Sequence, residues 1–228
     1  MIGAHSSASA AACAVLAAIA IGSACHAKPG ALSPLDPSAE AGGRPLRVLV
    51  LGDSLAVSPS LAESFPTVLQ ARISDLGLNW TMVNAGRPGD TTSGGLARVD
   101  ALLGSDVGIL VLELGANDGL RGVDLAIIDQ NLSAIIERAQ TRGINVLLCG
   151  METPPLRGWN YAIGFHEIFP RLAAKYRVAL VPFLLDGVAL DPRMNGGDGI
   201  HPNATGARRI AETVWPYLIP LLSTTTSR

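Results

Sequence analysis

Short apolar segments alternate with longer amphipathic ones along residues 46–221, with a repeat of about thirty residues. The short segments, such as the run 48–51 with its two valines, have the length and β-branched content of buried strands. The longer segments carry apolar residues three and four positions apart, which is the spacing of a helix face. Strands that alternate with helices are joined by βαβ crossovers. The chain therefore predicts an α/β fold with a mainly parallel sheet and helices on both faces.

This alternation predicts five strands and five helices within one domain. Strands are expected at 46–51, 80–84, 107–113, 144–149 and 178–182. Helices are expected at 61–76, 92–103, 124–142, 161–176 and 204–221. Gly77 and Gly143 follow two of these helices, at the position where a glycine commonly ends a helix. Pro216 lies inside the last helix, and we expect it to kink or end that helix.

The first residues of the chain predict a secretion signal. Residues 10–24 form an Ala-rich apolar run that is long enough for the core of a signal peptide and short for a membrane-spanning helix. Cys25 and Ala27 supply the small residues of a cleavage site, although no Lys or Arg precedes the run. Lipid attachment at Cys25 is an alternative, but Gly22 stands where a lipoprotein signal has a large aliphatic residue.

These features divide the chain into three parts. We predict a signal peptide at 1–27, a flexible linker rich in Pro, Gly, Ala and Ser at 28–45, and the folded domain at 46–222. The mature protein is then exported, to the periplasm or out of the cell. We expect no stable membrane insertion after the signal is cleaved, with an uncleaved anchor as the alternative.

Charge and cysteine content exclude several classes of partner. The chain has 17 Lys and Arg against 19 Asp and Glu, without the basic patch that nucleic acid requires. Cys13 and Cys25 lie in the predicted signal, which leaves Cys149 alone in an apolar run, where we expect it to be buried. A lone cysteine supports neither a disulfide nor a zinc site. We therefore expect no nucleic-acid partner, no metal and no cofactor.

Polar, Gly-rich segments follow three of the predicted strands and precede the last helix. These segments are Gly52-Asp53-Ser54 after the first strand, 84–92 after the second, 113–119 after the third, and 198–203. The carboxyl ends of parallel strands meet at one edge of the sheet, where α/β folds bind their ligands. We therefore expect these four segments to converge on one site.

Three side chains in these segments have the chemistry of acyl transfer, which needs a nucleophile, a base and a group that orients the base. Ser54 stands at the turn that ends a strand and is the predicted nucleophile. His201 is the predicted base, because His166 lies in the middle of a predicted helix. Asp198 precedes His201 by three residues, so its carboxylate can reach Nδ1 and stabilise the imidazolium. Alternatively, Asp198 only caps a turn before the helix.

Acyl transfer also needs donors for the developing oxyanion. The side-chain amide of Asn117, just past a strand, can donate in this way, although Asn-Asp-Gly is also a common turn sequence. Gly89 allows a backbone N–H to approach a substrate closely. The N–H of Ser54 would supply a further donor. Asp53 is expected to shape the turn that presents Ser54.

Four sequence blocks resemble those of the GDSL/SGNH hydrolases, in the order and at the spacing usual for that family. They are Gly52-Asp53-Ser54-Leu55, Gly89-Asp90-Thr91, Gly115-Ala116-Asn117-Asp118 and Asp198-Gly199-Ile200-His201-Pro202. The segment 111–122 is similar to the bacterial arylesterase and multifunctional acyl-CoA thioesterase I–lysophospholipase branch. The resemblance implies a flavodoxin-like three-layer α/β/α fold with a five-stranded parallel sheet. It also implies a triad of Ser54, Asp198 and His201, with Ser54 N–H, Gly89 N–H and the Asn117 side chain as oxyanion hole.

The residues and the resemblance together predict a serine ester or thioester hydrolase that forms an acyl-enzyme on Ser54. Its substrate would be a small-molecule acyl ester or thioester, as in an arylesterase, acyl-CoA thioesterase or lysophospholipase. A carbohydrate O-acetyl esterase of the same fold and a non-catalytic envelope binding module are the alternatives. The segment 119–123 looks like the mobile loop that shapes the acyl pocket in this branch, or is an ordinary connector. Leu156 and Trp159 could line an apolar wall, or Trp159 could cover the core.

Overall fold

The computed structural model describes residues 45–225, so the predicted signal peptide and almost all of the predicted linker lie outside the described residues. Within these residues, five strands form one parallel sheet in the order β2-β1-β3-β4-β5. The strands are β1 (Leu46–Gly52), β2 (Trp80–Asn84), β3 (Val107–Glu113), β4 (Asn145–Cys149) and β5 (Ala179–Val181). This strand order is that of flavodoxin-like folds. The predicted fold class is confirmed.

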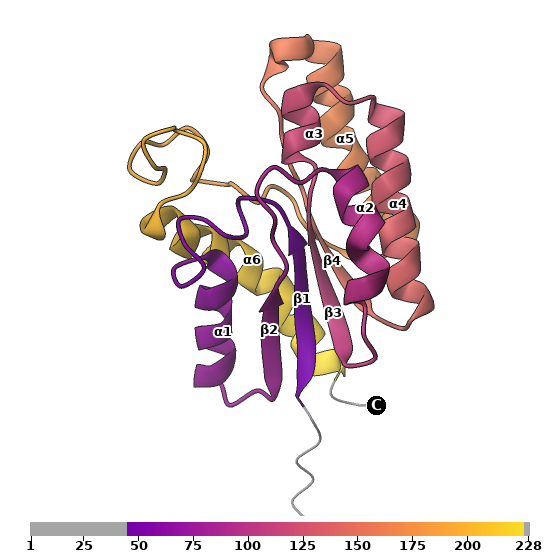
Figure 1. Ribbon diagram of the computed structural model, residues 1–228, viewed down its shortest axis with the longest axis vertical. Coiled ribbons are helices and arrows are strands. Elements are labelled where there is room, and N and C mark those ends of the chain that lie inside the picture. Colours follow the sequence, from indigo (N-terminus) through magenta and orange to yellow (C-terminus); the bar gives the residue numbers. More distant parts are fainter. Residues whose placement is uncertain (1–44, 226–228) are drawn as a thin grey trace, which may run out of the picture. The chain divides into compact units, whose positions relative to one another are not determined.

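Helices cover both faces of the sheet, as Figure 1 shows. On one face lie α2, α4 and α5, and on the other lie α1 and α6. The helices are α1 (Phe65–Asp75), α2 (Thr92–Leu102), α3 (Ala116–Arg121), α4 (Leu125–Thr141), α5 (Trp159–Tyr176) and α6 (Ala204–Thr225), with a 3₁₀ turn η1 (Pro155–Arg157). The five predicted helices are present. The short elements α3 and η1 were not predicted, because neither is long enough to display a helical period.

Of the two outcomes expected at Pro216, a kink or an end of the helix, the structure excludes the second, since α6 continues through Pro216 and Pro220 to Thr225. A proline in a helix removes one N–H donor, which normally breaks the helix. Here Val214, Leu218 and Leu222 are fully buried at intervals of four residues, on the face that packs against the sheet. Tertiary packing of this apolar stripe therefore outweighs the local cost of the prolines.

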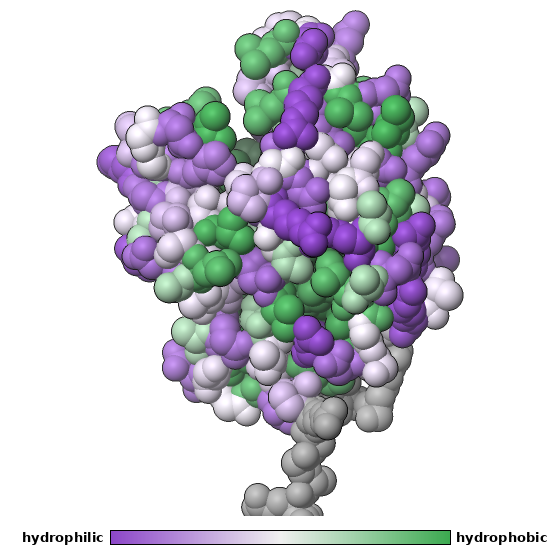
Figure 2. All heavy atoms as spheres, viewed as in Figure 1, coloured by the Kyte–Doolittle hydropathy of each residue, from purple (hydrophilic) through white to green (hydrophobic). Residues whose placement is uncertain are grey.

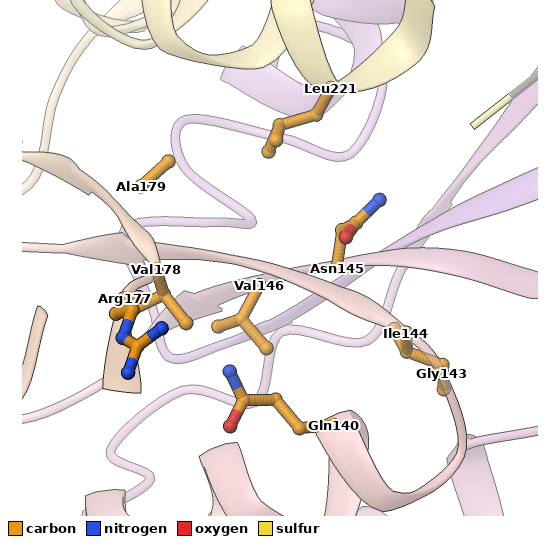
Figure 3. A pocket seen from close by; sticks show the side chains of 9 residues that line it. All are labelled: Gln140, Gly143, Ile144, Asn145, Val146, Arg177, Val178, Ala179 and Leu221. Atoms are coloured by element: carbon orange, nitrogen blue, oxygen red, sulfur yellow. The ribbon is translucent and has the colours of Figure 1, made fainter. Parts of the chain in front are cut away.

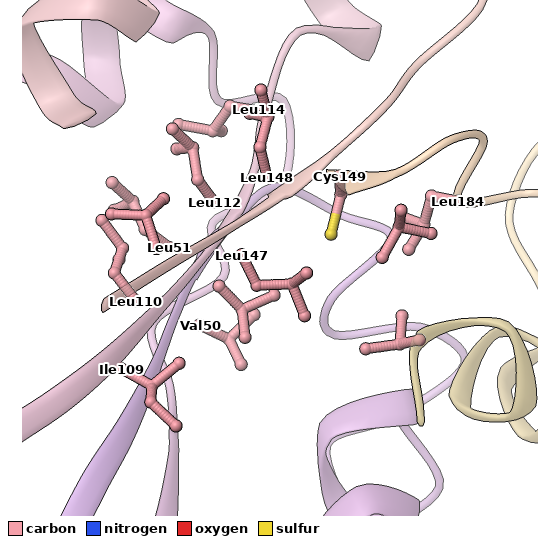
Figure 4. Close-up of a cluster of buried hydrophobic side chains, with 14 of the residues drawn as sticks. Val50, Leu51, Ile109, Leu110, Leu112, Leu114, Leu147, Leu148, Cys149 and Leu184 are labelled. Atoms are coloured by element: carbon pink, nitrogen blue, oxygen red, sulfur yellow. The ribbon is translucent and has the colours of Figure 1, made fainter. Parts of the chain in front are cut away.

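The central strands β1 and β3 supply the middle of the core. Every residue of β3 is buried, as are residues 48–52 of β1. Figure 4 shows side chains of both strands, and of β4, packed on the two faces of the sheet. Cys149 belongs to this cluster as a buried free thiol, as predicted. This apolar filling fixes β1 and β3 side by side and leaves their polar carboxyl ends at the edge.

The order of the strands changes direction at β1, because β2 lies on one side of β1 whereas β3, β4 and β5 follow on the other side. Ligands bind at such switch points, in the crevice outside the carboxyl ends of the strands. The turn after β1, which contains Ser54, and the segment after β3, which contains Asn117, lie at this point. Among the described residues, no helix is long and apolar enough to cross a membrane.

Candidate active site

Ser54 lies in a turn that is hydrogen-bonded to the last residue of β3, Glu113. The backbone N–H of Asp53 donates to Glu113 Oε2 (3.1 Å), and the N–H of Leu55 donates to Asp53 Oδ1 (2.9 Å). A Cβ on Gly52 would lie 2.3 Å from Glu113 Oε2, so only glycine fits beside this buried carboxyl group. The sharp exit from β1 thus depends on Glu113 as well as on the turn sequence itself.

His201 and Asp198 form a hydrogen-bonded chain with Ser54. His201 Nε2 lies 2.9 Å from Ser54 Oγ, and His201 Nδ1 lies 2.5 Å from Asp198 Oδ2. Asp198 Oδ1 accepts hydrogen bonds from the backbone N–H groups of Ile200 and His201, both at 3.0 Å. The hydrogen bond from the His201 side chain, followed by those from the two N–H groups, holds the pKa of Asp198 well below its ordinary value. Asp198 is therefore an ionised acceptor aimed at the imidazole.

Asn117 joins this chain through Asp53. It stands in the first turn of α3, where Gly115, with φ 123°, turns the chain out of β3. The Asn117 amide donates to Asp53 Oδ2 (2.9 Å), so one of its two N–H groups is held and the other remains available. Asp118 fixes α3 to the start of α2, because its carboxylate accepts from the backbone N–H and the hydroxyl of Thr92 (2.9 and 2.7 Å).

Gly89 lies in the turn between β2 and α2 and has φ 76°, a conformation that favours glycine. Its carbonyl accepts a hydrogen bond from the guanidinium of Arg121, at the end of α3 (3.0 Å). The next residue, Asp90, accepts from Arg98 Nε (2.8 Å). The turn that carries Gly89 is therefore tied both to α3 and to α2.

Arg98 is the residue that links three parts of this edge. Besides Asp90, it donates to the carbonyl of Ala85 after β2 (2.7 Å) and to the carbonyl of Gly52 at the end of β1 (3.0 Å). The side chains of Arg98 and Asp90 are only 10% and 12% exposed. A single buried guanidinium thus positions the turn of Gly89 relative to the strand that precedes Ser54.

Two buried carboxyl groups, Asp53 and Glu113, lie beneath the site, and neither is exposed to solvent. Burial raises the pKa of Asp53 to about 6, against the lowering effect of its hydrogen bonds from Leu55 and Asn117. Burial, and then the nearby Asp53, raises the pKa of Glu113 well above its ordinary value. The pair therefore holds a proton at pH values at which exposed carboxyl groups are ionised.

The structure places the sequence-predicted residues as follows. Ser54, His201 and Asp198 form one chain of contacts, and Asn117 is joined to it through Asp53. His166 is exposed on α5, with Nδ1 3.6 Å from Glu152 Oε1.

Sequence reasoning missed Glu113, Arg98 and Arg121. Glu113 was detectable as a carboxyl group inside an otherwise apolar strand. Arg98 and Arg121 carry no such signal, because their partners are distant in sequence.

Figure 2 shows a hollow at this edge, between the lobe of α3 and α5 and the segment that precedes α6, and apolar side chains border it. A separate pocket of about 310 Å³ lies at the opposite edge, where β4 and β5 begin (Figure 3). Its lining includes Gln140, Val146 and Arg177, and none of the residues around Ser54. In the described part of the chain, no three His, Cys, Asp or Glu side chains group closely enough to hold a metal ion.

Comparison with known proteins gives consistent matches over the same part of the chain. Residues 50–209 match the model of the GDSL-like Lipase/Acylhydrolase family. The chain is 42% identical over 178 residues to the Esterase TesA of Pseudomonas aeruginosa, covering 77% of this chain and 89% of that protein. It is 39% identical over 176 residues to an Arylesterase of Vibrio mimicus, covering 76% and 88%. It is 36% identical over 179 residues to Thioesterase 1/protease 1/lysophospholipase L1 of Escherichia coli K12, covering 77% and 85%.

Solved structures agree with these matches. The crystal structure of TesA superposes with a TM-score of 0.73 at 41% identity, over 77% of this chain and 99% of that one. AlinE4, an SGNH-hydrolase family esterase, superposes with a TM-score of 0.65 at 38% identity, over 78% and 97%. An acetyl xylan esterase, AlAXEase, with a TM-score of 0.64 and 20% identity, shares the fold.

Proposed function

Because the chain belongs to the GDSL-like lipase/acylhydrolase family and is a serine hydrolase of ester or thioester bonds, we propose that Ser54 is its nucleophile. His201 is the general base and Asp198 orients it. One observation carries this assignment: His201 lies 2.9 Å from the Ser54 hydroxyl through Nε2 and 2.5 Å from Asp198 through Nδ1. This is the order of contacts that serine acyl transfer uses.

In the first half-reaction, Ser54 Oγ attacks the carbonyl carbon of the substrate as His201 Nε2 takes the hydroxyl proton. The ionised Asp198 stabilises the imidazolium that forms. The tetrahedral intermediate then expels the alcohol or thiol, which receives the proton from His201, and leaves the acyl group on Ser54. In the second half-reaction, a water gives its proton to His201 and attacks the acyl-enzyme. Collapse of that intermediate returns the proton to Ser54 and releases the carboxylic acid.

We assign the oxyanion donors to the N–H groups of Ser54 and Gly89 and to the side chain of Asn117. Asp53 supports this role, because it holds one N–H of the Asn117 amide at 2.9 Å and so fixes the direction of the other. A donor that is fixed before the reaction costs no reorganisation when the oxyanion forms. Asp53 is thus assigned a positioning role and Asp198 the role in the triad.

We propose that the substrates are acyl esters and thioesters, among them lysophospholipids, in keeping with the names of the relatives. We also propose that the protein acts outside the cytoplasm, because residues 10–27 have the pattern of a cleaved secretion signal.

The test is replacement of Ser54. Ser54→Ala should reduce hydrolysis of p-nitrophenyl butyrate on the order of 10⁴-fold or more. Ser60→Ala is the matched control, because Ser60 is an exposed serine in the same segment, and it should retain full activity. Circular dichroism should show both variants folded. An Ser54→Ala variant that kept more than a few per cent of the activity would refute the assignment.

A substrate panel separates the two remaining hydrolase classes. The protein should cleave p-nitrophenyl acyl esters and acyl-CoA thioesters faster than acetylated sugars. The opposite ranking would identify a carbohydrate O-acetyl esterase. Turnover of none of these, by protein with a normal melting curve, would support a binding module.

A further inference from the structure

Large apolar side chains are exposed together on the lobe formed by α3, η1 and the start of α5. Leu156 is 76% exposed and Trp159 is 71% exposed, and Leu120 and Ile163 are also exposed. We call these four residues the apolar tip. Single exposed apolar residues need no explanation, whereas grouped ones mark a surface that contacts something apolar.

The apolar tip is not an outlying part of the core. The buried face of α5 is made by Phe165, Ile168, Phe169 and Leu172. Trp159 and Ile163 are four residues apart and so share a face of the helix, one that lies outside this buried stripe. The exposure of Trp159 excludes the alternative that it covers the core.

Contacts between the elements join the apolar tip to the site. The guanidinium of Arg157, in η1, donates to the carbonyl of Arg121 at the end of α3 (3.1 Å). Arg121 in turn donates to the carbonyl of Gly89 (3.0 Å). Tyr161, in the first turns of α5, donates to the carbonyl of Val123 (2.7 Å). The apolar tip therefore stands on the same edge of the sheet as Ser54, beside the turn of Gly89.

Positive charge accompanies the apolar tip. Arg121 and Arg157 are exposed, and their guanidinium groups donate to backbone carbonyls. In the described residues, neither guanidinium forms a salt bridge with a carboxylate. Figure 2 shows apolar and strongly polar side chains next to one another on this lobe, at the top of the view. Trp, Leu and Ile bordered by Arg is the composition of segments that lie in the interface of a lipid bilayer.

We propose that the apolar tip, with Arg121 and Arg157, docks the protein on an anionic phospholipid surface. The apolar side chains enter the boundary between headgroups and acyl chains, and the arginines pair with phosphates. Docking in this way brings the edge that contains Ser54 to acyl esters held in the lipid. The purpose of docking rests on the proposed function, but the binding itself requires no hydrolysis.

Trp159 provides the first measurement. The other two tryptophans are buried or half-buried, so Trp159 is the one that a lipid surface can reach. The protein is purified after export, without the predicted signal peptide, and is mixed with vesicles of phosphatidylglycerol and phosphatidylcholine in equal parts, or of phosphatidylcholine alone. We expect a blue shift of the emission with the anionic vesicles, and a weaker one with neutral vesicles or high salt. Trp159→Phe should lose the shift but still float with the vesicles.

Variants test which residues cause the binding. The double variant Leu156→Asp/Trp159→Asp should lose vesicle partitioning by about ten-fold or more, because apolar area no longer leaves water. Arg157→Gln should lose about five-fold, the factor that corresponds to about 1 kcal/mol per basic residue at an anionic surface. Leu76→Asp is the matched control, since Leu76 is 56% exposed at the far end of α1, and it should bind as the unaltered protein does.

Every variant is also assayed on the water-soluble ester p-nitrophenyl butyrate and by melting curve. Docking predicts unchanged kcat and KM for this ester and an unchanged Tm. Absence of flotation by the unaltered protein would overturn the proposal, as would an equal loss in Leu76→Asp. A raised KM for the soluble ester in the double variant would make the tip an acyl-binding wall instead. A dimer that the double variant dissociates would make it a contact between two copies.

The two proposals fail in different ways. If the protein hydrolyses the soluble ester but does not bind vesicles, the docking proposal is refuted and the proposed function stands. If the protein binds vesicles but hydrolyses no ester, the proposed function is refuted and the docking proposal stands.

Discussion

Replacing Arg98 with alanine is expected to lower both the stability and the activity of the protein. The guanidinium is almost buried and donates to Asp90 (2.8 Å) and to the carbonyls of Ala85 (2.7 Å) and Gly52 (3.0 Å). The Gly52 carbonyl also accepts from a backbone N–H (3.0 Å), so it keeps a partner in the variant. Asp90 and the Ala85 carbonyl each lose a donor.

The size of the effect follows from this burial. Removal of one partner of a buried ion pair costs about 3–5 kcal/mol, because the other charge stays buried and unpaired. The free energy of unfolding should fall by about that amount, measured by urea denaturation. The turn that carries Gly89 also loses its tie to the strand before Ser54. A displacement of about 1 Å at reacting groups costs about a hundred-fold in rate, so kcat should fall by roughly 10- to 100-fold.

Arg138 provides the matched control. It too donates to a carboxylate, that of Asp100 (2.8 Å), and to a backbone carbonyl, that of Leu96 (3.1 Å). Its side chain is 39% exposed and lies away from the carboxyl ends of the strands. Arg138→Ala should therefore cost only about 0–1 kcal/mol and leave kcat unchanged.

If the alanine variant does not fold, Arg98→Lys tests the role of the Arg98 contacts instead. Lysine retains the charge beside Asp90 but cannot make the three directed contacts of the guanidinium. We expect it to recover most of the stability and little of the lost kcat. An Arg98→Ala variant with less than about 1 kcal/mol of destabilisation and normal kcat would refute the assigned role.

Two further predictions concern the carboxyl groups of the site. Asp198→Asn should reduce kcat on the order of 10⁴-fold, because the ionised acceptor at His201 Nδ1 is lost. Asp186→Asn is the control, because Asp186 is an exposed aspartate, and it should keep full activity. Equal activity of the two variants would refute the assignment of Asp198 to the triad. Asp53 has its pKa raised from 3.8 to about 6 by burial, so the folded state binds more protons than the unfolded state between these values. Its contribution to stability is therefore full below pH 4 and is lost as the pH rises through about 6, by roughly 3 kcal/mol. The free energy of unfolding, measured by urea denaturation from pH 4 to pH 7, should show this loss in the unaltered protein and not in Asp53→Asn. Parallel plots of this free energy against pH for the two proteins would contradict the prediction.

The fold could be predicted closely because local and global signals agree. Apolar strands such as 107–113 are buried on both faces and bounded by polar turns, so their limits are visible in the residues themselves. The errors occur where this agreement fails. The six-residue helix α3 begins in a Gly-Ala-Asn-Asp sequence that reads as a turn, and α6 passes two prolines because its buried stripe holds it in place.

The groups proposed to perform the chemistry could be found from residue type, since few side chains can act as nucleophile, base or oxyanion donor. Ser54, His201, Asp198 and Asn117 were identified in this way. The groups that position them were harder to find. Arg98 contacts carbonyls that lie 13 and 46 residues away in the chain, and nothing near it in sequence indicates these partners.

Glu113, at the end of the buried strand β3, explains why the turn after β1 begins with a glycine. A carboxyl group at the end of a buried strand costs free energy unless it is paired or protonated, so its presence there requires a reason. The structure supplies one: Glu113 Oε2 accepts the N–H of Asp53 and fills the space where a Cβ on Gly52 would lie. Gly52 and Glu113 are therefore a matched pair, and the glycine of the Gly-Asp-Ser-Leu turn is required by a side chain on a different strand. A motif that reads as four consecutive residues is, in three dimensions, a contact between β1 and β3.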